Sequence, residues 1–456
     1  MLILDDLVYI LQQENYDGKR FLKFVYQNLQ WNNLMKRKKL VITKKSLIIL
    51  GISIVALLMI TVLSISSFSF FRIIIIFLVV YFSLPLIIVM ILWLLFPVDY
   101  LLKQKKTKKA NAILKKCEKL KVIGITGSFG KTTLKNILLN ILQEKFNVIK
   151  TPGNINTDIG IANFIIENQN KIQKADILII EMGAYRQGEI AKISKMVNPE
   201  HSFLTGIGLS HLERFGSLKK IIKTKFELLQ YTKQKCFLNG DNNYIKKYCR
   251  KNKLRKCSLI SSGKIGNIKF LENFQGLEFE YQGEQFKTKL LARHNLVFIL
   301  MGIVLARKLE MNMVEIKRGV EKIEPIKHRL EPIYNDKTKI WIIDDSYNGN
   351  YQGFLSGLDV LQRHSGRKVI LTPGIVEQGK KSEQIHKKIG KKYSKKTDLV
   401  LLIDNSATRY IIKGMEEKNF KNYKIYKTTQ DAHQDLPNVL QSGDVILFQN
   451  DLSDNY

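Results

Sequence analysis

The stretch that most constrains this chain is a glycine-rich loop at residues 124–133, which reads G-I-T-G-S-F-G-K-T-T. A short apolar run, residues 120–123, precedes it, and the loop is followed by apolar residues at helical spacing: Leu134, Ile137, Leu138, Ile141 and Leu142. In a strand–loop–helix unit of this kind, backbone N–H groups close around phosphate oxygens at the positive end of the helix. The spacing differs from the strict G-x-x-x-x-G-K-[ST] pattern because Ile125 occupies the first glycine position. The loop predicts a nucleoside triphosphate site.

Two polar residues of this loop have specific expected roles. Lys131 is predicted to reach the β- and γ-phosphates, and the hydroxyl of Thr132 to ligate Mg²⁺. The remaining predicted ATP-binding positions of the loop are Gly127, Ser128, Gly130 and Thr133.

The composition narrows the classes of protein to consider. A chain of 456 residues with 45% hydrophobic residues and only 8 prolines is expected to fold into two to four domains. Its net charge of +33 is typical of proteins that bind nucleic acid, an anionic membrane face or acidic substrates. The densest basic runs flank long apolar segments, which favours a membrane over nucleic acid. The 4 cysteines form no C-x-x-C pair and fit reduced thiols in the cytoplasm.

Two apolar segments near the N-terminus are long enough to cross a bilayer. They cover residues 47–66 and 73–97, separated by a short turn with Arg72. Basic runs lie outside both segments, so the positive-inside rule places both ends of the hairpin in the cytoplasm, at the inner or plasma membrane. We therefore predict a basic cytoplasmic segment (1–46), two transmembrane helices (47–97) and a basic linker (98–119). A buried soluble hairpin and a cleaved signal peptide are the disfavoured alternatives.

From Leu120 onward the pattern is α/β, with short apolar runs between helical patterns. We predict a P-loop ATPase domain with a parallel sheet (120–327) and a Rossmann-like α/β domain (328–456), divided near Lys327. The expected strands of the first domain are 121–125, 176–181, 202–206 and 235–238, with a short strand at 147–149, an antiparallel hairpin over 268–281 and 285–291, and a helix over 296–308. Those of the second domain are 339–343, 368–371, 399–403 and 444–448.

Several polar residues follow these predicted strands, where open α/β sheets bind ligands. Glu181 ends one strand and can hold Mg²⁺, and His211 follows the next strand. The pair Asp344–Asp345 could meet a ribose or an amine substrate. From pattern alone, a strand-end glutamate is common, a single histidine is more often structural, and Lys225 is one lysine among many. Substrate contacts are expected from two polar loops, at Asn154, Asn156, Tyr347 and Asn348.

Taken in order along the chain, these motifs resemble the Mur ligases of bacterial cell-wall synthesis. The similar stretches run from Leu120 to about Gly379 and read G-I-T-G-S-F-G-K-T-T, T-P-G-N-I-N-T-D-I-G, E-M-G-A-Y-R-Q-G-E-I, G-L-S-H-L-E-R-F-G-S, K-T-K-F-E, L-N-G-D-N, A-R-H-N, H-R-L-E and D-D-S-Y-N-G-N. Each motif is weak by itself, and their common order makes the resemblance specific.

The resemblance implies roles that the residues alone did not establish. Glu181 and His211 would serve the metal ions, and Lys225 matches a lysine that is carbamylated in this family, which makes it a metal ligand. Together with Lys131, these three form the implied catalytic set. Asn295 would meet the adenine. Arg329 and Asp345 would meet the phosphate and ribose.

The chemistry implied is ATP-dependent amide formation through an acyl phosphate, with Mg²⁺ as cofactor. The similarity is greatest to members that add D-alanyl-D-alanine to a UDP-linked muropeptide. The apolar hairpin stands where these members have their UDP-sugar domain, and residues 372–379 depart from their G-D-M-x-E-L-G pattern. The acceptor therefore stays open, with a lipid-linked muropeptide or a poly-γ-glutamate chain as alternatives and membrane lipid as an expected partner. A regulatory P-loop ATPase is less favoured, and the GTPase patterns D-x-x-G and [NT]-K-x-D do not occur.

Overall fold

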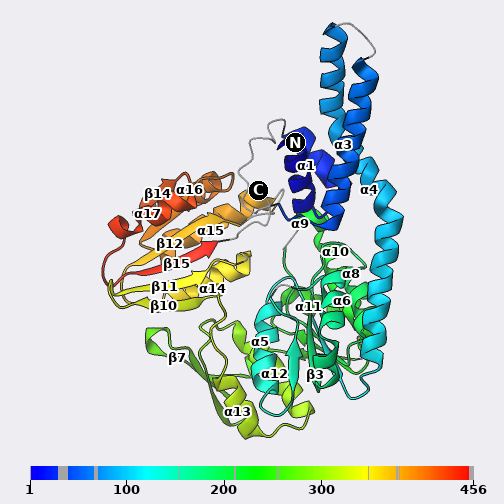
Figure 1. Ribbon diagram of the computed structural model, residues 1–456. Helices are drawn as coiled ribbons and strands as arrows, with labels where there is room; N and C mark the ends of the chain where they lie inside the picture. The colour runs from blue at the N-terminus through cyan, green and yellow to red at the C-terminus, as the bar shows by residue number, and fades with distance from the viewer. Residues whose placement is uncertain are drawn as a thin grey trace. The chain divides into compact units, whose positions relative to one another are not determined.

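The computed structural model describes residues 2–28, 40–65, 70–153, 155–209, 212–252, 254, 256–347, 349–375, 378 and 381–450. The described chain divides into two compact units (Figure 1). The first ends at Lys105 and the second begins at Lys106. The predicted phosphate loop and the described part of the predicted α/β region therefore belong to the second unit.

The first unit is helical. Its elements are α1 (Leu2–Gln13), α2 (Gly18–Gln27), α3 (Lys44–Ile65) and the larger part of α4 (Phe70–Lys115). Asp17 caps α2, because its side chain accepts hydrogen bonds from the backbone N–H groups of Lys19 and Arg20. Apolar side chains of the four helices form one buried core, to which α1 and α2 contribute Leu7 and Phe21. Within the predicted basic segment 1–46, residues 2–27 thus build two packed helices.

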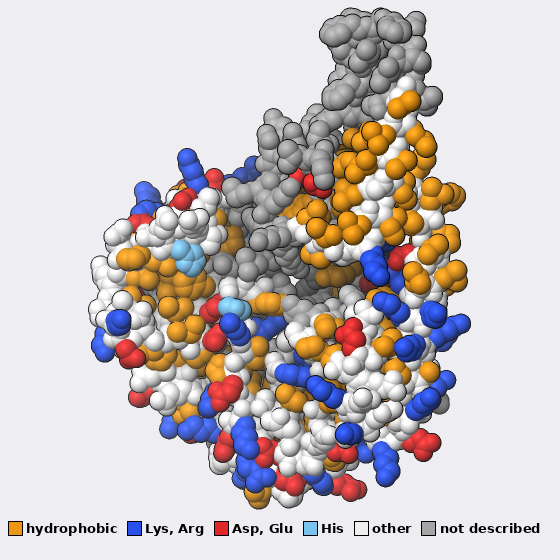
Figure 2. Space-filling view, in the orientation of Figure 1, with side chains coloured by type: hydrophobic (Ala, Val, Ile, Leu, Met, Phe, Trp, Pro, Cys, Tyr) orange, Lys and Arg blue, Asp and Glu red, His pale blue; other side chains and the backbone are white. Residues whose placement is uncertain are grey.

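Both predicted membrane segments fall in helices, α3 and α4. Among the described residues, one stretch is long and apolar enough to cross a membrane, Phe82–Lys115 within α4, with a mean hydropathy of 2.2 in its most apolar window. This stretch overlaps the predicted span 73–97, and that either segment, 47–66 or 73–97, crosses a membrane stays a prediction. Figure 2 shows apolar side chains gathered on the face of these helices, and those exposed on α3 and α4 include Leu47, Ile52, Val55, Leu58, Met59, Val62, Met90, Trp93, Leu94 and Phe96.

The second unit begins with a six-stranded parallel sheet in the order β2-β3-β1-β4-β5-β6. Its strands are β1 (Lys121–Thr126), β2 (Val148–Lys150), β3 (Ile177–Met182), β4 (His201–Leu204), β5 (Lys235–Asn239) and β6 (Cys257–Ile260). The strand order changes direction around β1, which lies between β3 and β4. Loops that follow these three strands therefore meet at one edge of the sheet, the usual ligand site of such folds.

Helices cover both faces of this sheet. They are α5 (Lys131–Leu142), α6 (Asp158–Glu167), α7 (Gln169–Gln173), α8 (Glu189–Val197), α9 (Leu212–Phe215), α10 (Leu218–Phe226), α11 (Asn243–Lys251), α12 (Asn295–Lys308) and α13 (Met313–Glu321). Successive residues of β1 point to opposite faces, so Ile123 joins the core under α5 and α12 and Val122 joins the core under α6 and α8. The end of α4 completes the second core with Ala110.

A small antiparallel sheet follows the parallel one. It contains β7 (Gly266–Phe270), β8 (Leu277–Tyr281) and β9 (Glu284–Thr288). The turn between β8 and β9 has positive φ at both Gln282 and Gly283, which matches the twist of the two strands. The predicted hairpin is present, and β7 adds a third strand to it. Short 3₁₀ turns also occur in this unit: η2 (Glu227–Tyr231), η3 (Ser262–Lys264) and η4 (Glu272–Phe274).

The C-terminal part of the second unit is a second α/β sheet in the order β10-β11-β15-β12-β13-β14. All neighbours are parallel except β10 with β11. Its strands and helices are β10 (Glu331–Asn335), β11 (Ile340–Asp345), α14 (Tyr351–Leu361), β12 (Lys368–Gly374), α15 (Ser382–Lys396), β13 (Leu399–Ile403), α16 (Thr408–Glu416), β14 (Tyr423–Tyr426), α17 (Thr429–Val439) and β15 (Val445–Asn450). Two successive α/β domains with parallel sheets are thereby confirmed.

Candidate active site

The glycine-rich loop connects the end of β1 to the start of α5. Gly130 has φ +78° and precedes the first turn of α5. A Cβ atom at this position would lie 2.4 Å from the ring of Phe298 on α12, so both the backbone conformation and the space require glycine. On the other side of the loop, the backbone N–H of Ser128 donates to the carbonyl oxygen of Gly206, at 2.7 Å. Packing against α12 and the segment after β4 thus holds the loop.

Lys131, Thr132 and Glu181 come together at this loop. The Thr132 hydroxyl donates to Oε2 of Glu181 at 2.9 Å, and Lys131 Nζ donates to the carbonyl oxygen of Gly127 at 3.0 Å. The register of β1 and β3, which places Ile125 opposite Glu181, brings the carboxylate to the loop. Thr133, another predicted residue of the loop, is buried on α5.

Charge compensation keeps this buried carboxylate ionised. Burial would raise the pKa of Glu181, but the charges of Lys131 and Lys135 outweigh burial and lower the pKa below its usual value. Burial lowers the pKa of Lys131, and Glu181 opposes that effect. The site thus presents a lysine beside an anionic oxygen pair.

The polar loop after β2 reaches the same place. The Asn156 side chain donates from Nδ2 to Oε1 of Glu181 at 3.3 Å, and its backbone carbonyl accepts from Gly183 N–H at 2.7 Å. Thr157 then caps α6 by accepting from the backbone of Gly160. Asn154 lies outside the described residues.

Lys225 lies on α10 and is 3% exposed. Its Nζ is 5.9 Å from the centroid of the Phe215 ring. Burial, reinforced by the charge of Lys131, lowers the pKa of Lys225 to about 7, although Glu189 and Glu227 oppose the shift. A substantial fraction of this amine is therefore neutral at pH 7. His211, the other predicted metal ligand from this part of the chain, lies outside the described residues.

These residues border one polar pocket. Its walls come from the phosphate loop, the loop after β2, the segment after β3, and α9 with α10, and its lining residues are Gly127, Ser128, Lys131, Asn156, Gly183, Ala184, Tyr185, Phe215 and Lys225. Four segments that are distant in sequence thus build the pocket. Four of the predicted site side chains line it: Ser128, Lys131, Asn156 and Lys225.

The C-terminal domain contributes a second group of predicted residues. Asp345 ends β11, and burial raises the pKa of its carboxyl to about 7 while Arg329 opposes the shift. The Arg329 guanidinium lies 4.7 Å from the centroid of the Tyr347 ring, and burial lowers its pKa while the charge of Glu181 raises it. Asn348 lies outside the described residues. Asn295 begins α12, one turn before Phe298, and is 7% exposed.

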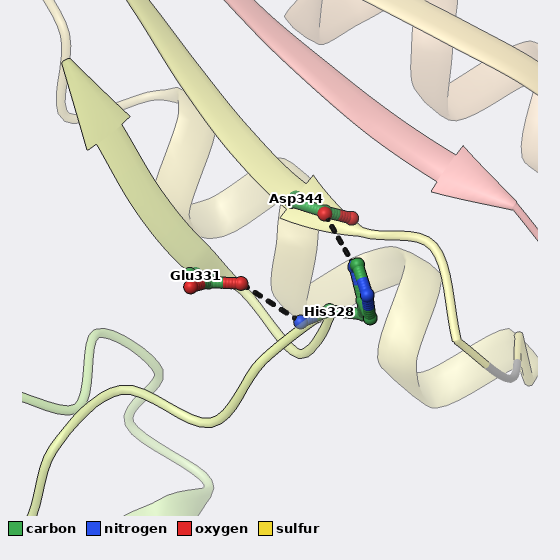
Figure 3. Close-up of side chains that lie close together, drawn as sticks. All are labelled: His328, Glu331 and Asp344. Carbon is green, nitrogen blue, oxygen red and sulfur yellow. Dashed lines mark hydrogen bonds and ion pairs between the residues drawn. The ribbon is translucent and has the colours of Figure 1, made fainter.

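A cluster of His328, Glu331 and Asp344, which we call the clasp, flanks Arg329 and Asp345 (Figure 3). The ring Nδ1 of His328 is hydrogen-bonded to Oδ2 of Asp344 at 2.7 Å, and the backbone N–H of His328 donates to Glu331 at 3.0 Å. The ligand atoms of the three residues lie within 4.8 Å of one another. Their mutual hydrogen bonds fix the turn that carries Arg329. From the sequence, Asp344 was expected, with Asp345, to meet a ribose or an amine substrate, whereas His328 and Glu331 had no assigned role.

Lys135 was also missed by sequence reasoning. It lies on α5, one turn after Lys131, and is 1% exposed. Its Nζ is 3.1 Å from Oε2 of Glu181. The helical spacing from Lys131 was the available signal, because residues four apart share one face of a helix.

Comparison with known proteins agrees with this geometry. A family described as "Mur ligase middle domain" matches residues 125–306, and one described as "Mur ligase, glutamate ligase domain" matches residues 328–449. This chain belongs to the Mur ligases. The two matches follow the order of the two α/β domains and together include every predicted site residue.

Individual Mur ligases are similar over most of this region. The UDP-N-acetylmuramoyl-tripeptide--D-alanyl-D-alanine ligase of Escherichia coli K12 is 29% identical over 288 residues, which cover 59% of this chain and 61% of the relative. The enzyme of the same name from Bacillus subtilis 168 is 26% identical and covers 72% of each chain. This chain thus spans about three fifths of the length of the first relative.

Solved structures of Mur ligases share the fold. The MurF ligase of Thermotoga maritima in complex with ADP has a TM-score of 0.67 and 25% identity, covering 77% of this chain and 81% of that one. MurF from Acinetobacter baumannii also has a TM-score of 0.67, with 24% identity and coverage of 76% and 77%.

Proposed function

We propose that this Mur ligase forms an amide bond at the expense of ATP, adding D-alanyl-D-alanine or a similar amine to a muropeptide carboxylate in peptidoglycan precursor synthesis. The observation that carries the proposal is the 2.9 Å contact of Thr132 with Glu181 beside Lys131, at the end of a phosphate-binding loop. The named activity of the relatives and the ADP complex of the T. maritima enzyme support the same chemistry.

The residues present fit Mg²⁺. The hydroxyl of Thr132 and the carboxylate of Glu181 offer hard oxygen ligands of the kind this ion prefers. Lys225 would add two further oxygens once its neutral amine is carbamylated, and His211 is the remaining proposed ligand. Bound there, Mg²⁺ would supply neutralisation of phosphate charge.

The phosphate loop and Lys131 would hold ATP, with Asn295 at the adenine and Arg329 and Asp345 at the phosphate and ribose. A substrate carboxylate oxygen attacks the γ-phosphorus, and the bond from this phosphorus to the bridging oxygen breaks to release ADP. The amine nitrogen then attacks the acyl carbon, phosphate leaves with the C–O bond pair, and the nitrogen loses a proton. A closed pocket protects the acyl phosphate from water.

Substrate contacts are proposed from the side chains that border the pocket or the clasp. Asn156 lines the pocket and holds Glu181, so it could orient a substrate carboxylate near the γ-phosphate. Tyr347 stacks on Arg329 and so lies next to the proposed phosphate contact. Asn154 and Asn348 are proposed by their neighbourhood in sequence alone.

We further propose that α3 and α4 form a two-helix membrane hairpin with the catalytic domains in the cytoplasm. The apolar side chains exposed on both helices support this, because soluble surfaces seldom carry so many. The same exposed surface favours a second candidate for the acceptor, a lipid-linked muropeptide. In that case membrane lipid, rather than a soluble nucleotide sugar, would present the substrate.

One experiment tests both candidates. Detergent-solubilised protein is incubated with ATP, Mg²⁺ and a panel of UDP-linked, lipid-linked and poly-γ-glutamate acceptors. Each acceptor is combined with amino acids or D-alanyl-D-alanine as the amine. Mass spectrometry identifies the products. The proposal expects one acceptor–amine pair to gain the mass of an amide with equimolar ADP. ADP release with no amide product from any pair would instead indicate a regulatory ATPase.

A further inference from the structure

The P-loop domain contains a lysine whose ammonium group is almost completely removed from water. Lys135 is 1% exposed and is among the largest fully buried side chains of the described chain. Burying a charge without a partner is very costly, so the contacts of its Nζ must compensate. Those contacts connect parts of the proposed active site.

Two partners, on different segments, accept from Lys135. Its Nζ lies 3.1 Å from Oε2 of Glu181, at the end of β3. It also donates to the carbonyl oxygen of Gly153, at 2.9 Å, in the loop that leads to Asn156. One ammonium group therefore connects α5, the carboxylate and the polar loop.

Glu181 is thereby held by three donors. Lys135 and Thr132 both contact Oε2, and Asn156 contacts Oε1. Thr132 is itself a proposed metal ligand, whereas Lys135, a cation, cannot coordinate a metal. Its contribution to the site is to fix where the Glu181 oxygens lie and to keep the loop from moving away from them.

We propose that Lys135 is a positioning residue, which holds Glu181 and the loop at Gly153 in the arrangement that binds Mg²⁺ with the nucleotide. This inference rests on the proposed function for the identity of the metal. It goes beyond it by assigning part of the metal affinity to a residue that, as a cation, cannot itself ligate the metal. Such supporting contacts typically change metal affinity by roughly 10- to 100-fold.

The test measures Mg²⁺-dependent binding of ADP rather than formation of the amide bond. Fluorescently labelled ADP is titrated with Mg²⁺ on the full chain in detergent, and the half-saturating Mg²⁺ concentration is compared between the wild type and Lys135→Met. We expect this concentration to rise about 10- to 100-fold, while ADP affinity without Mg²⁺ changes by less than about threefold. Lys135→Arg, which keeps a cation, should recover part of the loss.

Lys150 offers a matched control. It is partly buried on β2, and its Nζ makes its hydrogen bond to the side chain of Asn136 instead. Lys150→Met removes the same charge from the same neighbourhood, and should leave the Mg²⁺ dependence as in the wild type.

A variant that does not fold would also be informative. If Lys135→Met unfolds, the unpaired carboxylate of Glu181 is the expected cause, and the double variant Lys135→Met/Glu181→Gln should fold. Its half-saturating Mg²⁺ concentration should then equal that of Glu181→Gln alone within about twofold, because Lys135 acts through Glu181.

Several results would overturn the inference. They are an unchanged or lowered half-saturating Mg²⁺ concentration in Lys135→Met, an equal loss of ADP affinity with and without Mg²⁺, and a further shift in the double variant. Wild-type protein that binds ADP without any Mg²⁺ dependence would overturn the proposed function as well. Failure of the ligation assay with normal Mg²⁺-dependent ADP binding would affect the proposed function alone.

Discussion

The hydroxyl of Thr132 donates a hydrogen bond of 2.9 Å to Oε2 of Glu181, although the two residues are 49 positions apart in the chain. The adjacency of β1 and β3 produces this contact, because both strands end at the same edge of the parallel sheet. It joins the loop expected to hold phosphates to a carboxylate that is expected to hold a cation. The catalytic properties expected of this site depend on the side chains that surround that pair.

Lys131 should be essential for ATP turnover. Lys131→Ala removes a cation proposed to balance charge on the γ-phosphate, so turnover should fall by roughly 10²-fold or more. Release of ADP from ATP is the measurement, and circular dichroism checks the fold. Lys121→Ala, at the opposite end of β1, should keep the wild-type rate. Near-normal turnover in Lys131→Ala would show that this loop is not the catalytic one.

Lys225 should act as its carbamate. Lys225→Ala should lose activity, and short carboxylates such as formate or acetate should partly restore it because they supply the missing oxygens. Lys225→Arg should stay inactive, since a guanidinium keeps its charge and cannot be carbamylated. Wild-type rates in Lys225→Arg, or no rescue of a folded Lys225→Ala protein, would contradict the carbamate.

The pKa of Lys225 gives this site a pH dependence. Carbamylation requires the neutral amine, and with a pKa of about 7 the neutral fraction rises as the pH increases from 6 to 8. At an equal concentration of dissolved CO₂, activation of CO₂-depleted enzyme should therefore be faster at pH 8 than at pH 6. An activation rate that does not change over this range would argue against the lowered pKa.

His201 should make the fold sensitive to acid. Its ring is 1% exposed and its Nδ1 atom, among the described residues, has no hydrogen-bond partner. Burial lowers its pKa below the ordinary 6.5 although Glu200 opposes the shift, so protonation favours the unfolded chain. The free energy of unfolding should fall as the pH decreases below 6.5, with a slope from this residue of at most about 1.4 kcal/mol per pH unit.

Denaturant titrations at several pH values check this prediction. In His201→Phe, the loss of unfolding free energy between pH 6.5 and pH 5 should be smaller than in the wild type. His433→Phe provides a comparison, because His433 stacks on Phe448 in the C-terminal domain. Equal pH dependence in His201→Phe and the wild type would show that the ring is not buried neutral.

The membrane topology can be tested on cells. If α3 and α4 form a hairpin, residues 1–46 and everything after Pro97 should be cytoplasmic. Protease added to intact cells should leave the catalytic domains uncut, and the same protease should cut them after permeabilisation. Digestion from outside would contradict both the topology and an ATP-dependent function.

Much of the fold follows from local patterns. The loop at residues 124–133 and the buried strands β1, β3 and β13 were predicted within a residue or two, because a buried parallel strand is a continuous apolar run. Strands β6, β10 and β14 were not predicted. Each lies at the edge of a sheet and exposes part of its side chains, so its sequence lacks that run.

The features of the active site likewise fall into two groups, those that could be predicted from the sequence and those that could not. The phosphate loop and the family motifs could be predicted before the structure, since glycine spacing and motif order are read along the chain. Three features came from the fold instead: the contact of Lys135 with Glu181, the clasp beside Arg329, and the burial that lowers the pKa of Lys225 to about 7. Contact and desolvation depend on which distant segments fold against a side chain, and residue type alone does not specify them.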